Sequence, residues 1–169
     1  MPETEEQYRA RLAGYVKNQD PLQLQRQTLT ELNRLLDGAS SQQLGFRPAP
    51  GKWSIVEIFA HLAEDELVTS WRYRQMIEHD GATLAGFDQE LWARLGDYQN
   101  WNAREAFDMF RLLRDANLRM LAALSPEQWE RSGHHAERGR ITVRDLARHM
   151  AAHDVNHLKQ VEALLAVQG

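Results

Sequence analysis

The sequence predicts an all-α protein, a four-helix bundle with short extra helices in the connections. Three observations support this fold class: apolar residues recur at helical spacing, capping signals precede the helical stretches, and no alternating β-branched run is long enough for a strand. The connections are of modest length, which favours an antiparallel bundle. With 169 residues and no internal repeat, we expect a single domain over residues 1–169.

The first long helix is predicted over residues 21–38. Asp20 supplies the N-cap, and Pro21 suits the first helical position because the N–H that proline lacks would have no partner there. Gly38 marks the end of the helix. The apolar residues at helical spacing between these signals are Leu22, Leu29, Leu32, Leu35 and Leu36. A proline-rich segment, residues 47–52, separates this helix from the rest of the chain.

The second long helix is predicted to begin after Ser54. Ser54 and Glu57 form a capping box, in which each side chain accepts a hydrogen bond from a backbone N–H at the start of the helix. We expect this helix to end near Gly81. Residues 81–101 are predicted as a loop with one short helix around residues 90–94.

Three further caps predict the remaining helices. Asn102 begins the third long helix, with Glu105 in the reciprocal capping position. Ser125, followed by a proline, caps a short helix that ends near residue 133, and residues 134–140 form a loop. Thr142 then opens the last long helix, which continues to about residue 168.

Composition excludes several classes of function. Apolar residues make up 43% of the chain, charged residues make up 26%, and the net charge is −4, as in ordinary soluble proteins. The sequence has no basic run and no apolar stretch near the roughly 20 residues that span a bilayer, so we expect neither a nucleic-acid partner nor a membrane partner. The acidic N-terminus is unlike a secretory signal, so we expect a cytoplasmic protein. Because the chain lacks cysteine, disulfides, thiolate ligands and a cysteine nucleophile are excluded.

The most specific signal is a row of three histidines in the last helix. His149, His153 and His157 follow one another at intervals of four residues, which places neighbours on nearly the same helix face, about 6 Å apart along the axis. Two such imidazoles can bind one metal ion. The outer two lie about 12 Å apart, too far for one ion with metal–nitrogen bonds of about 2.0–2.1 Å. The ligands are therefore one adjacent pair, and the spacing leaves open which one.

His61 is the best candidate for a third ligand. It lies on the same helical stripe as Ile58 and Leu62, so its imidazole is expected to point into the bundle, where another helix can supply a partner. Asp65 lies one turn further on and is a candidate to orient His61 or to take a proton, although a surface or helix-pairing carboxylate is the favoured interpretation. Gln160 is expected to hydrogen-bond near the site or to pack against a neighbouring helix.

Other patterns favour ordinary structural roles. His79, His134 and His135 lie in or beside predicted loops and are expected on the surface. Residues 153–157 partly match the His-Glu-x-x-His helix of zinc proteases, but Asp154 replaces the glutamate base, which argues against a protease. Phosphate-binding glycine loops and a nucleophilic serine elbow are absent from the sequence.

Several segments resemble the DinB/YfiT-like metalloprotein superfamily. Residues 47–58, Arg-Pro-Ala-Pro-Gly-Lys-Trp-Ser-Ile-Val-Glu-Ile, followed by His61-Leu62-Ala63, resemble the entry to that family's second helix. Residues 139–142 and 153–161 resemble its last helix, and residues 88–114 resemble one branch of it. The resemblance implies a four-helix bundle of the DinB/YfiT-like type that holds a metal ion with His61, His153 and His157. His149 is then a neighbour of the site and not a ligand.

The resemblance also implies a function. Three neutral imidazoles leave an open coordination position and the full charge of a divalent ion, and either zinc or nickel suits such ligands. Such an ion lowers the pKa of a bound water or thiol. Superfamily members include S-transferases and isomerases that use thiols such as bacillithiol or mycothiol. We therefore expect a metal-dependent transferase that joins an external low-molecular-weight thiol to a small electrophilic substrate.

Two alternatives to the transferase remain open. One is a non-catalytic, metal-binding stress or interaction protein, in which the ion ties two helices together. The other is a metal-dependent hydrolase, in which bound hydroxide takes the place of the thiol. We further expect a homodimer formed through bundle helices. The sequence does not identify the substrate or a general base.

Overall fold

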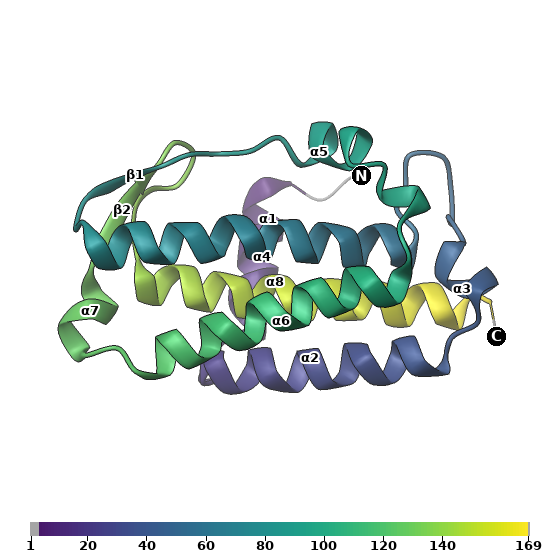
Figure 1. The fold of residues 1–169 in the computed structure, drawn as a ribbon, viewed down its shortest axis with the longest axis horizontal. Helices are drawn as coiled ribbons and strands as arrows, with labels where there is room; N and C mark the ends of the chain where they lie inside the picture. The colour runs from purple at the N-terminus through teal and green to yellow at the C-terminus, as the bar shows by residue number, and fades with distance from the viewer. Residues whose placement is uncertain (1–3, 169) are drawn as a thin grey trace.

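The computed structural model describes residues 4–168 and confirms the predicted four-helix bundle. Its long helices are α2 (Pro21–Gly38), α4 (Ile55–Glu78), α6 (Ala103–Ala122) and α8 (Val143–Ala166). α4 packs along α6 and α2 packs along α8, while α4 also contacts α8 and α2 also contacts α6 (Figure 1). None of the helices in the described residues is long and apolar enough to span a membrane.

The antiparallel arrangement expected from the sequence is wrong for two neighbouring pairs of helices. α4 and α6 run in one direction, and α2 and α8 both run in the other (Figure 1). The reason is the connection over residues 79–102, which returns along the whole length of the bundle before α6 begins (Figure 1). A 24-residue helix such as α4 is about 36 Å long, and a largely extended connection of similar residue number easily covers that distance.

Side-chain caps begin the long helices as predicted. The Asp20 side chain accepts from two backbone N–H groups at the start of α2, and Ser54 with Glu57 forms the predicted reciprocal box. Thr142 and Asp145 form another box at the start of α8. Asn102 caps α6 by accepting from the N–H of Glu105, but the Glu105 side chain forms no bond back to Asn102 in the described structure.

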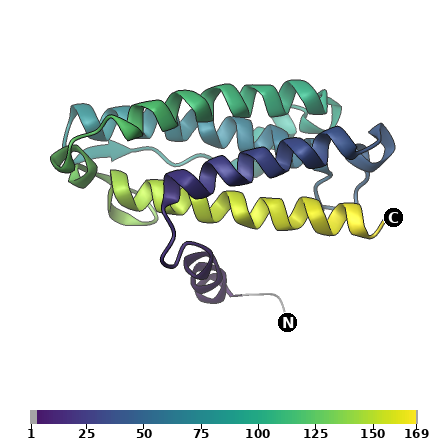
Figure 2. The same cartoon turned by 90° about the horizontal axis from the view of Figure 1, so that it is seen from below.

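Within residues 4–168, four short α-helices lie outside the four-helix bundle. The predicted ones are α5 (Gln89–Leu95), somewhat longer than expected, and α7 (Pro126–Glu130). Two others were not predicted: α3 (Ser41–Gly45), and α1 (Glu5–Tyr15), which lies against α8 and crosses it (Figure 2). Leu12 and Val16, on and just after α1, pack on two small residues of α8, Ala151 and Ala152. A 3₁₀ turn, η1 (Tyr98–Asn100), precedes α6.

The expectation that the chain has no strand is wrong. β1 (Ala82–Leu84) pairs in parallel with β2 (Ser132–His135), which pairs in the antiparallel sense with β3 (Gly139–Thr142). α4 ends at Glu78, earlier than predicted, and Gly81 adopts a φ of +84°, which favours glycine, where the chain turns toward β1. Strands of three or four residues carry too few positions for an alternating pattern. This sheet covers one end of the bundle (Figure 1).

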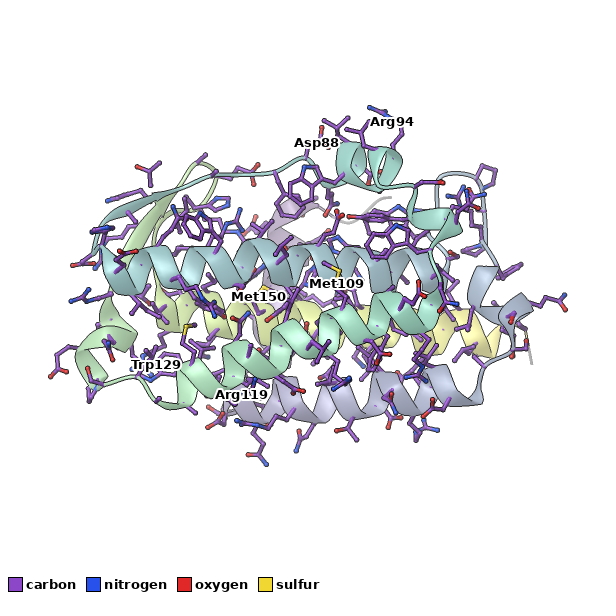
Figure 3. All side chains as sticks on the ribbon, viewed as in Figure 1. Asp88, Arg94, Met109, Arg119, Trp129 and Met150 are labelled. Carbon is purple, nitrogen blue, oxygen red and sulfur yellow. The ribbon has the colours of Figure 1, made fainter. Side chains whose placement is uncertain are left out.

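The core lies between the four long helices in two main clusters. One cluster joins the first half of α4 and of α6 to the second half of α8, around Phe59, Phe107 and Phe110. The other joins the second half of α4 to the first half of α8, around Tyr73, Met76 and Met150. Figure 3 shows Met150 among the helices, whereas Asp88 and Arg94 lie on the outer side at α5. The level between the two clusters, around residue 65 of α4, is where polar side chains enter the interior.

Candidate metal centre

The structure brings His61, His153 and His157 together between α4 and α8. The Nε2 atom of His153 lies 3.2 Å from Nε2 of His61 and 3.0 Å from Nε2 of His157. All three side chains are buried, with exposed fractions of 2%, 8% and 6% in order of sequence. We call these residues the histidine triad. No other group of three or more metal-ligating side chains is found among the described residues.

The geometry of the triad fits a tetrahedral metal ion. Two nitrogen ligands of a tetrahedral ion with bonds of about 2.0–2.1 Å lie about 3.3 Å apart, close to the distances between the Nε2 atoms here. Without a cation, two imidazole nitrogens in such short contact need one proton between them, so that one nitrogen donates and the other accepts. If both nitrogens carried a proton, they would repel each other. A cation that accepts three nitrogen lone pairs satisfies all three atoms at once. With three protein ligands, such an ion keeps a coordination position for another molecule.

Burial keeps the triad in the neutral form that metal binding requires. Burial lowers the pKa of His61 well below its usual value, and His157 lowers it further. Burial also lowers the pKa of His153 well below its usual value, and the other two members of the triad lower it further. Burial lowers the pKa of His157 to about 4, partly offset by Gln160. The nitrogens of the triad are therefore free of extra protons at neutral pH.

Asp65 contacts the triad from the side opposite the Nε2 atom of His153. Its Oδ2 lies 3.5 Å from Nδ1 of His153, so the carboxylate stands beside His153 and not beside His61, the partner considered from the sequence. Asp65 is buried, with 9% of its surface exposed, so a surface position is wrong, whereas its contact with α8 agrees with the expected helix-pairing role. Burial and then Glu66 raise the pKa of Asp65 to about 6, so it is ionised at neutral pH. A carboxylate near Nδ1 favours a proton there and leaves Nε2 for the metal.

His149 lies one turn before the triad and makes a different contact. Its Nε2 is 2.8 Å from Nη2 of Arg138, so it accepts a hydrogen bond from the guanidinium. Burial and then the charge of Arg138 lower the pKa of His149 to about 3. The structure thus places His149 outside the triad, with its ring centre 6.0 Å from that of His153.

The three histidines expected on the surface do not behave alike. His79 and His134 are exposed, as expected. His135 is buried on β2, with 7% exposure, and its Nδ1 accepts a hydrogen bond from the N–H of Glu137. The surface prediction for His135 is wrong because this residue belongs to the unpredicted sheet.

A buried charge network lies next to the triad, and the sequence did not predict it. The guanidinium of Arg114, on α6, donates to both oxygens of Asp154 and to Glu66, 2.7 Å away through Nη2. Asn117 donates to the other oxygen of Glu66. Burial acts to lower the pKa of Arg114, but the two carboxylates outweigh it and hold the pKa well above its usual value. Asp154 is thus an ion-pair partner of α6 and not a base at the triad.

The signal for this network was present in the sequence. Arg114 lies four residues after Phe110 and four before Leu118, in the apolar stripe of α6. Glu66 holds the corresponding place four residues after Leu62. A charged residue within an apolar stripe indicates a buried partner of opposite charge on a neighbouring helix.

In the described part of the chain, two large cavities border the triad. One, which we call the apolar cavity, has a volume of about 630 Å³ and is lined by all three histidines together with Trp53, Ile58 and Leu164. The ring centre of Trp53 lies 5.0 Å from that of His61. The other, which we call the polar cavity, has a volume of about 810 Å³. Its wall includes His61, His153, Asp65, Arg72, His135 and His149.

Segments outside the four long helices contribute residues to the walls of both cavities. Tyr8 from α1 and Gln89 from α5 line the apolar cavity and the polar cavity alike, as do His61 and His153. The cavities therefore meet at the triad, under residues supplied by two short helices. Each volume is in the range that holds a small molecule.

Comparison with known proteins agrees with this architecture. Residues 22–161 match the model of the DinB superfamily. Two proteins of Oceanobacillus iheyensis are similar: "Putative metal-dependent hydrolase OB0782", 26% identical over 80% of this chain and 81% of that protein, and "Putative metal-dependent hydrolase OB0413", 25% identical over 83% of each.

A solved structure shares the fold. It is that of YfiT from Bacillus subtilis, described as a probable metal-dependent hydrolase with an unusual four-helix bundle topology. The match has a TM-score of 0.81 with 17% sequence identity and covers 98% of this chain and 90% of the other. The family match spans most of the sequence and agrees with the resemblance seen in its helix-entry and last-helix motifs. The chain belongs to the DinB superfamily.

Proposed function

We propose that this protein is a metal-dependent S-transferase, in which the triad holds zinc or nickel and a low-molecular-weight thiol attacks a small electrophile. When bound, the ion would supply a Lewis acid that lowers the pKa of the thiol. The single observation that carries this proposal is the meeting of two separate cavities at the triad. A reaction of two small molecules needs two binding spaces that open on one reacting position.

The side chains around the triad have distinct roles in this proposal. Asp65 orients His153 through its Nδ1 side. Trp53, Ile58 and Leu164 offer the electrophile an apolar surface and limit the access of water. The thiol would lie in the polar cavity, which contains charged and hydrogen-bonding side chains.

A second candidate, a metal-dependent hydrolase, is favoured by the names of the two Oceanobacillus iheyensis relatives. It uses the same triad but needs no thiol, because water is the nucleophile. In this case Asp65 remains a positioning residue for His153.

The first experiment is the metal content of protein prepared without a histidine tag, beside the variants His61→Ala, His157→Ala and His149→Ala. We expect about one equivalent of zinc or nickel in the wild type and in His149→Ala, and none in the two triad variants. His149 is the matched control because it lies at the same helical spacing from His153 as His157 does. Metal retained in His61→Ala would contradict a site that joins α4 to α8.

The second experiment separates the candidate reactions. The metal-loaded protein is incubated with a panel of electrophiles, including aryl halides and activated esters, with and without a panel of thiols. Turnover that requires a thiol supports the transferase, and ester cleavage without a thiol supports the hydrolase. Metal binding without any turnover would favour the non-catalytic alternative, in which the ion stabilises the fold. His153→Ala should abolish both metal binding and turnover.

A further inference from the structure

A buried arginine in the polar cavity forms no direct ion pair with the described residues. Arg72, on α4, is 7% exposed. Its Nη2 donates to the backbone oxygen of Ala85 at 2.6 Å, and in the described part of the chain its buried Nε has no hydrogen-bond partner. No carboxylate among residues 4–168 lies within ion-pair distance of this guanidinium; Asp65 and Glu137 lie further away and act on its pKa only through their charge, which raises it. The ring of Phe87 covers one side, 5.9 Å away.

Such an arrangement is costly unless another molecule completes it. Arginine stays charged even when burial lowers its pKa, as it does at Arg72. A buried charge that forms no direct ion pair generally destabilises a fold, so unpaired guanidinium groups in cavities are uncommon. An anion that enters a cavity with such a guanidinium can pair with it without a further desolvation cost for the arginine, because folding has already removed the arginine from water.

The rest of the cavity determines which anion fits. Arg138 contributes a second guanidinium, which donates to His149. The positive charges of these arginines lower the pKa of His135, after burial itself, so this histidine is neutral. Asp65 and two exposed acids, Asp88 and Glu137, also line the cavity.

The balance of charge in the cavity depends on the metal. Three carboxylates outnumber two arginines in the protein alone. A divalent ion at the triad reverses the sign and leaves a small positive excess. A cavity with a small positive excess suits a single carboxylate better than a doubly charged phosphate, which the nearby carboxylates would repel.

We propose that Arg72 binds a carboxylate of the molecule that occupies the polar cavity. This inference rests on the proposed function and deepens it: one substrate is a small molecule with a carboxylate at one end and, in the transferase, its thiol at the triad. His61 and Arg72 lie eleven residues apart on α4, which is about 16 Å along the axis, and the arginine side chain spans part of that distance. The substrate therefore separates the two groups by several bonds.

The test uses cobalt-loaded protein and thiols of matched length. A thiolate that binds the cobalt ion produces a charge-transfer absorption band, so affinity is read without turnover. The probes are ω-mercapto acids from 3-mercaptopropionate to 8-mercaptooctanoate, each compared with the ω-mercapto alcohol of equal length. For at least one length we expect the acid to bind about tenfold or more tightly than the alcohol, from a charge-assisted hydrogen bond.

Variants locate the origin of this preference. Arg72→Gln should lose the preference for the acid while it binds the alcohol as the wild type does, which also shows that the variant folds. Arg72→Lys should keep part of the preference. Arg119→Gln is the matched control, because Arg119 is exposed on α6 and outside the cavity (Figure 3).

Three outcomes would overturn the assignment: equal binding of acid and alcohol at every length, an acid preference that survives in Arg72→Gln, or stronger competition by inorganic phosphate than by acetate. If no thiol produces the band, the proposed transferase fails, and Arg72 is then tested separately. In that case zinc-loaded wild type and Arg72→Gln are titrated calorimetrically with alkanoates and alkanols from four to eight carbons. The same loss of acid preference would support the carboxylate site, and its absence would refute it.

Discussion

Removal of the Arg114 guanidinium should destabilise this protein severely. Arg114, Asp154 and Glu66 are at most 1% exposed, and one guanidinium is bonded to both carboxylates. Arg114→Met would leave two buried carboxylates without a positive partner. Breaking a buried pair in this way generally costs about 3–5 kcal/mol, a large share of the roughly 5–15 kcal/mol that holds a domain folded. For a chain of this size we expect the melting temperature to fall by about 6–20 °C.

The assay is urea unfolding of the metal-free protein, followed by circular dichroism. Arg111→Met is the matched control: Arg111 is on the same helix and pairs with Asp108 and Asp115, but it is 41% exposed, so its loss should cost less than about 1 kcal/mol. A triple variant that combines Arg114→Met with Glu66→Gln and Asp154→Asn should recover much of the loss, because no unpaired charge remains. Equal effects of the Arg114 and Arg111 substitutions would refute the reasoning.

Three other predictions concern the site and the sheet. Asp65→Asn should weaken metal affinity about 10–100-fold with the triad intact, measured by competition with a chelator; unchanged affinity would show that Asp65 does not support His153. Stability of the metal-free protein should fall as pH decreases from about 6.5 to 4, because folding lowers the pKa of five histidines and the unfolded chain therefore takes up more protons than the folded one. Burial raises the pKa of Asp65 and of Asp154 to about 6, which opposes this loss only in part. The urea midpoint measured across that range should show the slope, and a flat profile would contradict it. The five histidines are His61, His135, His149, His153 and His157. Gly133→Ala should destabilise the protein by about 1–3 kcal/mol, since an added Cβ would lie 2.7 Å from the Leu84 side chain; a melting temperature equal to wild type would exclude this clash. The expected homodimer stays a prediction, which light scattering at micromolar concentration tests.

The helices could be predicted from the sequence because their causes are local. A cap such as Ser54 with Glu57 involves side chains and backbone within one turn. The inward direction of His61 followed from its place between Ile58 and Leu62 on one stripe, and all three are buried. Helix direction is not local in this sense. Whether α6 runs parallel or antiparallel to α4 depends on the path of residues 79–102, which no single turn of helix determines.

The site was harder to predict where a residue's surroundings come from several segments. Spacing alone left the choice between His149 and His157 open, because both lie four residues from His153. What distinguishes them is Arg138, from the turn between β2 and β3, which bonds to His149. His135 was missed for a related reason: its burial results from pairing with Leu84 of β1, 51 residues earlier in the chain. Tertiary contacts of this kind outweigh local sequence signals.

The metal ligands lie on long bundle helices, whereas part of the cavity walls comes from segments outside the bundle, and this separation affects how such a protein can diversify. The triad is anchored on α4 and α8, whereas Tyr8 and Gln89, which border both cavities, come from α1 and α5 outside the bundle. Loops and short connecting helices tolerate insertions and substitutions far better than packed helices do. Changes in these two segments can therefore alter which molecules enter the cavities without disturbing the metal ligands. The long return of the chain over α4 makes this bundle a scaffold on which one reactive centre can acquire new substrates.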